Sequence, residues 1–180
     1  MAVHLPLVFF MLAAALGALA PAGPNEPWKA LFDFETGLDR SLLETRDARA
    51  ELVSVPGGHA LRVELGHSID WPGITLKAPG GHWDLSAYAR VSVKLKNVGQ
   101  HAARFGLRVD NPGADGARNC VQVTARLEPG QSTVLTARFY PGLICFTKPV
   151  EFIGMQSVPG GPLRMDPRDV VVVRVFANRP

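Results

Sequence analysis

The sequence predicts an all-β protein, a jelly-roll β-sandwich of about eight or nine short antiparallel strands. Apolar and polar residues alternate in many short segments, most clearly in Val91–Leu95, and such alternation buries one face of a strand and leaves the other in water. Turn residues recur between these segments, as in the Pro and Gly clusters at 56–58, 79–81 and 129–130. No segment has a convincing helical period.

The expected strands follow one another along the chain. The first is Trp28–Glu35, and residues 38–49 form either one helical turn or an irregular loop. Ala50–Val55 and Ala60–Leu65 form a hairpin around the turn at 56–58. Further strands are expected at 74–77, 91–95, 104–110, 120–127, 132–139 and 169–177.

The first 22 residues differ from the rest of the chain. They contain no Asp, Glu, Lys or Arg, and residues 5–20 are almost wholly apolar, which suits a signal-peptide core and is short for a membrane span. Ala20-Pro21-Ala22 fits a cleavage site. We therefore expect a signal peptide over 1–22, a Pro-rich leader over 23–30 and a secreted or periplasmic domain over 31–180. An uncleaved membrane anchor is the alternative.

The charge pattern and the two cysteines bear on which partners and which covalent links the sequence predicts. The 19 Lys and Arg residues are scattered without a run of four, so nucleic-acid binding is not expected. The two cysteines, Cys120 and Cys145, can form a disulfide in an exported protein or remain two thiols that pack as small apolar groups. Neither alternative is favoured by the sequence.

Eight short motifs, in order and at consistent spacing, resemble a known family. They are Phe32-Asp33-Phe34-Glu35, Ala60-Leu61-Arg62-Val63, Trp71-Pro72-Gly73-Ile74, Trp83-Asp84-Leu85-Ser86, Val109-Asp110-Asn111, Leu127-Glu128-Pro129-Gly130, Ile153-Gly154-Met155 and Met165-Asp166-Pro167. The chain resembles the N-terminal carbohydrate-binding-like domain of agarase-type and beta-galactosidase-type glycoside hydrolases, a galactose-binding-like jelly roll.

The resemblance implies a non-catalytic carbohydrate-binding or accessory module of an exported polysaccharide-degrading protein, with a polysaccharide partner of galactan type. The family's catalytic carboxylates lie in a separate barrel domain, so no catalytic residue is carried over. Such domains usually end with one more strand that contains an Asp-Asn pair, and this chain stops at Asn178-Arg179-Pro180. We therefore expect a sandwich that lacks its final strand, with a possible catalytic domain downstream.

Two other functions are open. A purely structural sandwich could pack on a glycoside hydrolase catalytic domain and bind nothing. A jelly-roll polysaccharide lyase would need Tyr or His beside Arg or Lys on a concave face, and the chain has only two Tyr. No G-x-S-x-G, P-loop or H-E-x-x-H motif occurs in the sequence.

Sugars bind to aromatic faces flanked by polar side chains. The best aromatic candidate is Trp71, with Asp70 before it. Trp83 is expected to be structural, with Asp84 or Ser86 capping its turn. The full set of expected ligand-binding residues is Trp71, Asp70, Tyr140, Arg108, Asp110 and Asn111.

Each of these has a structural alternative, a core-edge anchor for Trp71 and an ordinary Asx turn for Asp110-Asn111. Asp33 and Glu35 flank Phe34 and are expected on one face of the first strand. Carboxylate oxygens suit Ca²⁺, so the pair is a candidate for a structural calcium, with solvated carboxylates as the alternative.

Overall fold

Ten strands and one short 3₁₀ turn make up the described part of the computed structural model, which covers residues 5–10, 28–139 and 165–178. The elements are β1 (Leu5–Phe10), η1 (Arg40–Leu42), β2 (Leu43–Arg46), β3 (Ala48–Val55), β4 (Gly58–Leu65), β5 (Gly73–Lys77), β6 (Arg90–Lys96), β7 (Ala103–Asp110), β8 (Cys120–Leu127), β9 (Ser132–Arg138) and β10 (Val172–Ala177).

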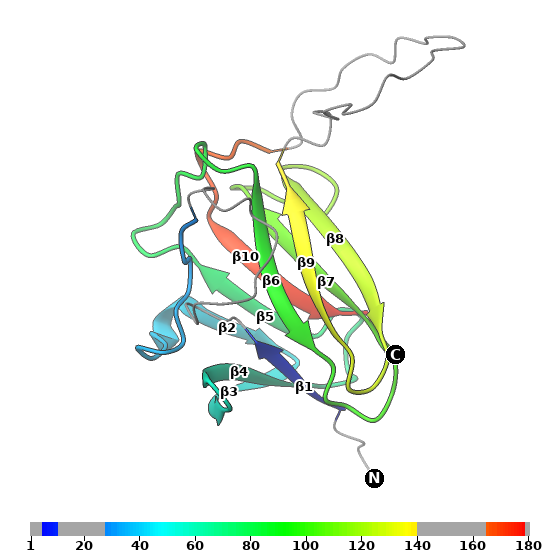
Figure 1. The fold of residues 1–180 in the computed structure, drawn as a ribbon. Coiled ribbons are helices and arrows are strands. Elements are labelled where there is room, and N and C mark those ends of the chain that lie inside the picture. Colours follow the sequence, from blue (N-terminus) through cyan, green and yellow to red (C-terminus); the bar gives the residue numbers. More distant parts are fainter. Residues whose placement is uncertain (1–4, 11–27, 140–164, 179–180) are drawn as a thin grey trace, which may run out of the picture.

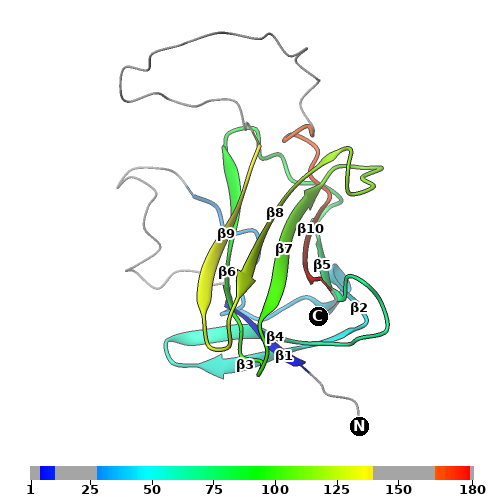
Figure 2. The same cartoon turned by 90° about the vertical axis from the view of Figure 1, so that its right-hand side faces the viewer.

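The strands form two five-stranded antiparallel sheets (Figure 1). The first sheet has the order β3-β4-β1-β6-β9, and the second has the order β2-β5-β10-β7-β8. Figure 2 shows β6 and β9 on one side of the molecule and β7, β8 and β10 on the other. The predicted all-β antiparallel sandwich is therefore confirmed.

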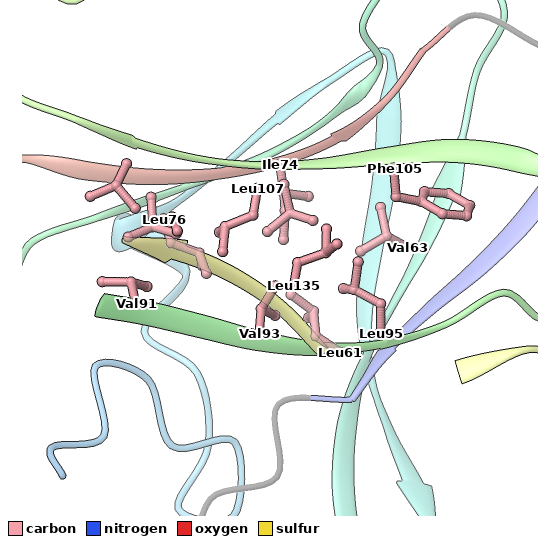
Figure 3. Close-up of a cluster of buried hydrophobic side chains, with 14 of the residues drawn as sticks. Leu61, Val63, Ile74, Leu76, Val91, Val93, Leu95, Phe105, Leu107 and Leu135 are labelled. Atoms are coloured by element: carbon pink, nitrogen blue, oxygen red, sulfur yellow. The ribbon is translucent and has the colours of Figure 1, made fainter. Parts of the chain in front are cut away.

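One apolar core lies between the sheets (Figure 3). Val91, Val93 and Leu95 project into it from β6, and every second residue of β7 meets them from the other sheet. The alternation that predicted these strands therefore selects the buried face. The largest fully buried side chains are Phe34, Phe105, Phe139, Leu61, Leu76, Leu95, Leu107, Leu127, Val63 and Val109.

The predicted hairpin and corner are both present. Val55 and Gly58 close the β3–β4 ladder, and Gly57 takes a φ of 91° in the turn, where glycine carries no steric cost. Trp83 is 6% exposed, and its Asp84 carboxylate accepts the Ser86 backbone N–H at 2.9 Å. The structural interpretation of this corner is therefore confirmed.

The predicted strand Trp28–Glu35 is wrong, because no strand is assigned between residues 28 and 39. Asp33 accepts the backbone N–H of Glu35 at 2.9 Å, a local bond that competes with ladder pairing. Phe34 is buried in the core at 1% exposure, whereas Trp28 is 67% exposed and does not pack as expected.

The segment after residue 38 contains a strand that the sequence did not reveal. Asp39 caps η1 by accepting the Ser41 N–H at 2.9 Å, and β2 then pairs with β5 from Leu43↔Leu76 to Arg46↔Gly73. Three of its four residues are exposed, so β2 has little apolar alternation. Its pairing comes from a strand distant in the sequence.

Strand β1 lies within the predicted signal peptide. It pairs with β4 from Leu5↔Leu65 to Phe9↔Leu61 and with β6 from Val8↔Lys96 to Phe10↔Lys94, which makes it the central strand of the first sheet (Figure 1). The expected cleavage site lies outside the described residues, and the signal peptide stays a prediction. Among the described residues, no helix is long and apolar enough to cross a membrane.

Candidate functional site

The second sheet has a face that points away from the core, which we call the outer face. Leu107 and Val109 of β7 are buried in the core, so the residues between and beside them point to the opposite side. Strand register then assigns the corresponding residues of the neighbouring strands. The outer-face residues are Glu44, Arg46, Gly73, Thr75, Lys77, Arg104, Gly106, Arg108, Asp110, Cys120, Gln122, Thr124, Arg126, Val172, Arg174 and Phe176.

An aromatic ring lies across this face. Phe176 of β10 is level with Gly106 on one side and Gly73 on the other. A Cβ added at Gly106 would lie 2.3 Å from Cζ of Phe176, and one added at Gly73 would lie 2.6 Å from its Cα. Gly106 therefore leaves room for the half-buried phenyl ring to lie along the sheet and extend over β7, whereas Gly73 lets β5 approach the backbone of β10 closely.

A group of three charged side chains lies farther along the same face, where Arg174 and Arg108 are two residues from Phe176 and Gly106, respectively. Asp110 accepts hydrogen bonds from Arg108 Nε at 2.8 Å and Nη2 at 3.0 Å, and from Arg174 Nε at 2.8 Å. Arg174 Nη1 also donates to Thr75 Oγ1 at 3.2 Å. The Asp110 side chain is 2% exposed, against 19% for Arg108 and 37% for Arg174.

This arrangement fixes two guanidinium groups with a net charge of +1. Each has five N–H donors and uses two of them in hydrogen bonds within the described part of the chain. Asp110, predicted to meet ligand hydroxyls, instead has both oxygens engaged by arginines. It positions Arg108 and Arg174, whose remaining donors can bind hydroxyl or acidic groups.

The loop between β7 and β8 closes one end of the outer face. A Cβ at Gly116 would lie 3.0 Å from Arg108 Nη1, so the loop passes over that guanidinium. Asp115 accepts the backbone N–H groups of Arg118 and Ala117, which lower its pKa. Cys120 is buried beneath the loop, and burial raises the pKa of its thiol. Cys145 lies outside the described residues, so the disulfide stays a prediction.

The other predicted binding residues are not gathered at this cluster. Trp71 is 55% exposed and lies just before β5, at the end of the face where Phe176 lies, and Asp70 precedes it in an exposed loop. Asp110 is at the opposite end, four residues along β10 from Phe176, or roughly 13 Å. Tyr140 lies outside the described residues.

Asn111 has a different role. Its side-chain amide donates to the carbonyl oxygens of Asp166, at 2.7 Å, and Asp169, and it accepts the Asp166 N–H at 2.6 Å. Its side chain therefore ties the end of β7 to the turn that precedes β10. This geometry favours the structural interpretation of Asn111.

The candidate calcium pair does not form a ready metal site. Glu35 accepts the His59 backbone N–H at 2.9 Å and lies 3.2 Å from its Nδ1, and these contacts lower the pKa of Glu35. Asp33 accepts the Glu35 N–H. Within the described ranges, no group of three or more His, Cys, Asp or Glu residues could hold a metal ion. A calcium ion stays a prediction.

Sequence reasoning did not identify Phe176 or Arg174. Both belong to the predicted strand 169–177, which was recognised by its apolar run. The alternation of Arg174 between Val173 and Val175 is a signal for an outward guanidinium. Only the register of β10 against β7 places it opposite Arg108.

Comparison with solved structures supports the fold. A structure of an exo-beta-agarase matches with a TM-score of 0.60 and 18% sequence identity over 83% of this chain. The crystal structure of an agarase, AgWH50C, matches with a TM-score of 0.53 and 14% identity over 82% of this chain. No protein-family profile and no curated protein sequence matches the chain.

These matches cover only a small part of the agarases. The chain corresponds to 23% of the first and 22% of the second. At such low identity the likeness establishes a shared fold and no more. This chain therefore has the fold of a segment that makes up less than a quarter of each of those two proteins.

Proposed function

We propose that this domain is a non-catalytic carbohydrate-binding or accessory module of an exported, agarase-like protein that degrades polysaccharide. The outer face of the second sheet is its binding surface. The observation that carries the proposal is the flat Phe176 ring on the same face as the fixed guanidinium groups of Arg108 and Arg174. Aromatic rings bind the C–H faces of sugars, and guanidinium groups donate to sugar oxygens.

The proposed ligand is a galactan-type polysaccharide, and the proposed setting is a polypeptide with a catalytic part elsewhere. Both are supported by the likeness to segments of two agarases and by the resemblance of the sequence motifs. The galactose-binding-like jelly-roll classification belongs to the same proposal. The outer face holds no Tyr or His among its described residues, so the side chains that the lyase alternative requires are not found on the described part of this surface.

Affinity electrophoresis tests the proposal. The protein should be retarded in gels that contain agarose or another galactan, relative to gels with an unrelated neutral polysaccharide. Phe176→Ala should weaken binding about 2- to 10-fold, because an aromatic contact contributes roughly 0.5–1.5 kcal/mol beyond its buried area. Val134→Ala is the matched control, since Val134 is an exposed apolar residue of β9 in the other sheet. Absence of retardation in every galactan gel would refute sugar binding.

A second candidate function is structural packing on a catalytic domain. An open groove of about 490 Å³ lies where β2 and β3 meet, and its lining includes Leu38, Leu43, Ala48, Ala50, Leu52 and Leu61. Leu52 is 38% exposed. If packing is the function, Leu52→Asp should abolish co-purification with the catalytic polypeptide, whereas Phe176→Ala should leave it intact.

A further inference from the structure

Strand β1 occupies a central position for which its own sequence is poorly suited. Pro6 is in register with Glu64 of β4. Proline has no backbone N–H and is normally confined to edge strands, strand starts or bulges. β1 lies between β4 and β6, and although its pairing with β6 begins only at Val8, Pro6 cannot donate a backbone hydrogen bond near the start of the strand.

The residues in register with β1 show a second mismatch. Leu61 and Val63 of β4 are buried in the core, so Arg62 points to the solvent side of the sheet. Val8 is in register with Arg62 on one side and with Lys96 on the other. The register position of Val8 thus lies between two cations of β4 and β6, and a carboxylate at this position would form favourable cross-strand pairs.

The Nε atom of Arg62 lacks a hydrogen-bond acceptor. Its Nε is buried and has no hydrogen-bond partner in the described residues, and the nearest carboxylate oxygen in an ion pair, Glu51 Oε1, is 3.9 Å away. A buried N–H without a partner is costly. The register therefore points to an acidic residue at the position that Val8 occupies.

We propose that β1 fills this place only in the precursor, and that the slot between β4 and β6 in the mature protein accepts a strand donated by the polypeptide that carries the catalytic part. This inference rests on the proposed function, which assumes that the protein is exported and that a catalytic polypeptide is its partner. The donated strand runs antiparallel to β4 and β6. It carries apolar residues opposite Leu61 and Val63 and a carboxylate opposite Arg62 and Lys96.

Cleavage would remove residues 1–22, which include β1 and are called the leader from here on, and would leave the slot too wide to close by direct pairing of β4 with β6. Neighbouring strands lie about 4.8 Å apart, so two strands flanking a third are separated by roughly 10 Å. Both edges would then expose unpaired backbone groups above the apolar core. The two matched agarases, of which this fold is less than a quarter, provide long additional chain, and this favours a donor in the same assembly over a second copy of the domain.

Strand exchange tests the proposal on the full chain. A protease site placed between Ala22 and Gly23 is cut after folding, and labelled peptides of residues 4–11 are then added. One peptide carries Pro6→Ala and Val8→Asp, and its control carries Pro6→Ala and Leu7→Asp. Fluorescence anisotropy measures uptake, and size-exclusion chromatography measures release of the leader fragment and the oligomeric state.

We expect the Val8→Asp peptide to displace the leader with a stoichiometry of one per chain. Two cross-strand charge pairs of about 0.5 kcal/mol each should make it bind about fivefold tighter than the unsubstituted peptide, and Arg62→Gln should reduce that preference. The Leu7→Asp peptide should not bind, because position 7 is in register with buried Val63. Equal binding of both peptides, or no exchange, would overturn the proposal.

Two further outcomes also overturn it. If the cut protein releases the leader, stays monomeric and fully stable and takes up no peptide, its own residues fill the slot. If the cut protein dimerises instead, a second copy of the domain fills the slot. Should the cut protein aggregate, thermal unfolding of uncut chains decides: Val8→Asp must raise the unfolding temperature and Leu7→Asp must lower it. None of these measurements uses polysaccharide, so failure of strand exchange and failure of galactan binding are distinguishable.

Discussion

Replacement of Asn111 separates a structural tie from a ligand contact. Its side chain makes three hydrogen bonds to the backbone of Asp166 and Asp169, and Asn111 is 7% exposed. Asn111→Ala removes all three. At about 1 kcal/mol net for each bond, the free energy of unfolding should fall by about 3 kcal/mol.

Urea denaturation measures this loss as a lower midpoint at an unchanged slope. For a domain of this size, 1 kcal/mol corresponds to about 2–4 °C, so the unfolding temperature should fall by roughly 6–12 °C. At neutral pH the Asn111→Asp variant should be no more stable than Asn111→Ala, because a carboxylate cannot donate hydrogen bonds to the two carbonyl oxygens.

The matched control is Asp115→Ala in the same loop, which removes two exposed bonds to Ala117 and Arg118 and should cost less. If Asn111→Ala changes stability by less than 1 kcal/mol but abolishes retention on galactan, the structural assignment is wrong and Asn111 is a ligand contact, as the sequence predicted.

The remaining predictions concern the outer face and acid stability. Gly106→Ala should weaken galactan retention, because the new Cβ would displace the Phe176 ring; unchanged retention would show that the flat ring is not required. Trp71→Ala should weaken retention by a similar 0.5–1.5 kcal/mol if that exposed ring stacks on sugar, and unfolding of this variant would instead identify Trp71 as a packing residue. Acid should destabilise the domain, because hydrogen bonds hold several carboxyl pKa values below their ordinary values of 4.5 for Glu and 3.8 for Asp. For Glu35 the main cause of the lowered pKa is the hydrogen bond from the His59 backbone N–H. The stability that these carboxylates contribute is fully present at a pH above their ordinary pKa values and is lost as the pH falls through their lowered pKa values. An unfolding temperature that stays constant down to pH 2 would contradict this prediction. The carboxylates concerned are Glu35, Asp39, Asp84, Asp115 and Asp166.

The strands that sequence predicted well are those whose alternation coincides with burial on one side. β6 and β8 lie within one residue of their predicted bounds, because each contributes every second side chain to the core. The segment 28–35 has an apolar pattern too, but it lies outside the sheets, where Asp33 accepts the local Glu35 N–H and Glu35 accepts the N–H of His59, 24 residues away in the sequence. β2 has no such pattern and depends on β5.

The candidate site was predictable only in part for a related reason. The sequence placed Arg108 and Asp110 in one predicted strand, 104–110, and alternation alone puts Arg108 on its polar face. Whether Asp110 meets a ligand depends on Arg174, which is 64 residues away in the sequence and adjacent through the β7–β10 register. Such pairing has no local signal, so a carboxylate that appeared available is buried and engaged.

The two proposals concern different sheets, and this makes them separable. All five strands of the second sheet lie between Leu43 and Ala177, so removal of the leader takes no residue from the outer face. The slot belongs to the first sheet, whose core-facing residues pack against the inner side of the second. An empty slot should therefore lower the stability of the whole sandwich without altering the hydrogen bonds among Arg108, Asp110 and Arg174.

Galactan binding by the cut protein, measured well below its unfolding temperature, should equal that of the uncut chain. A selective loss of binding on cutting would mean that the leader strand itself forms part of the ligand surface, and the outer face could not then be the whole site.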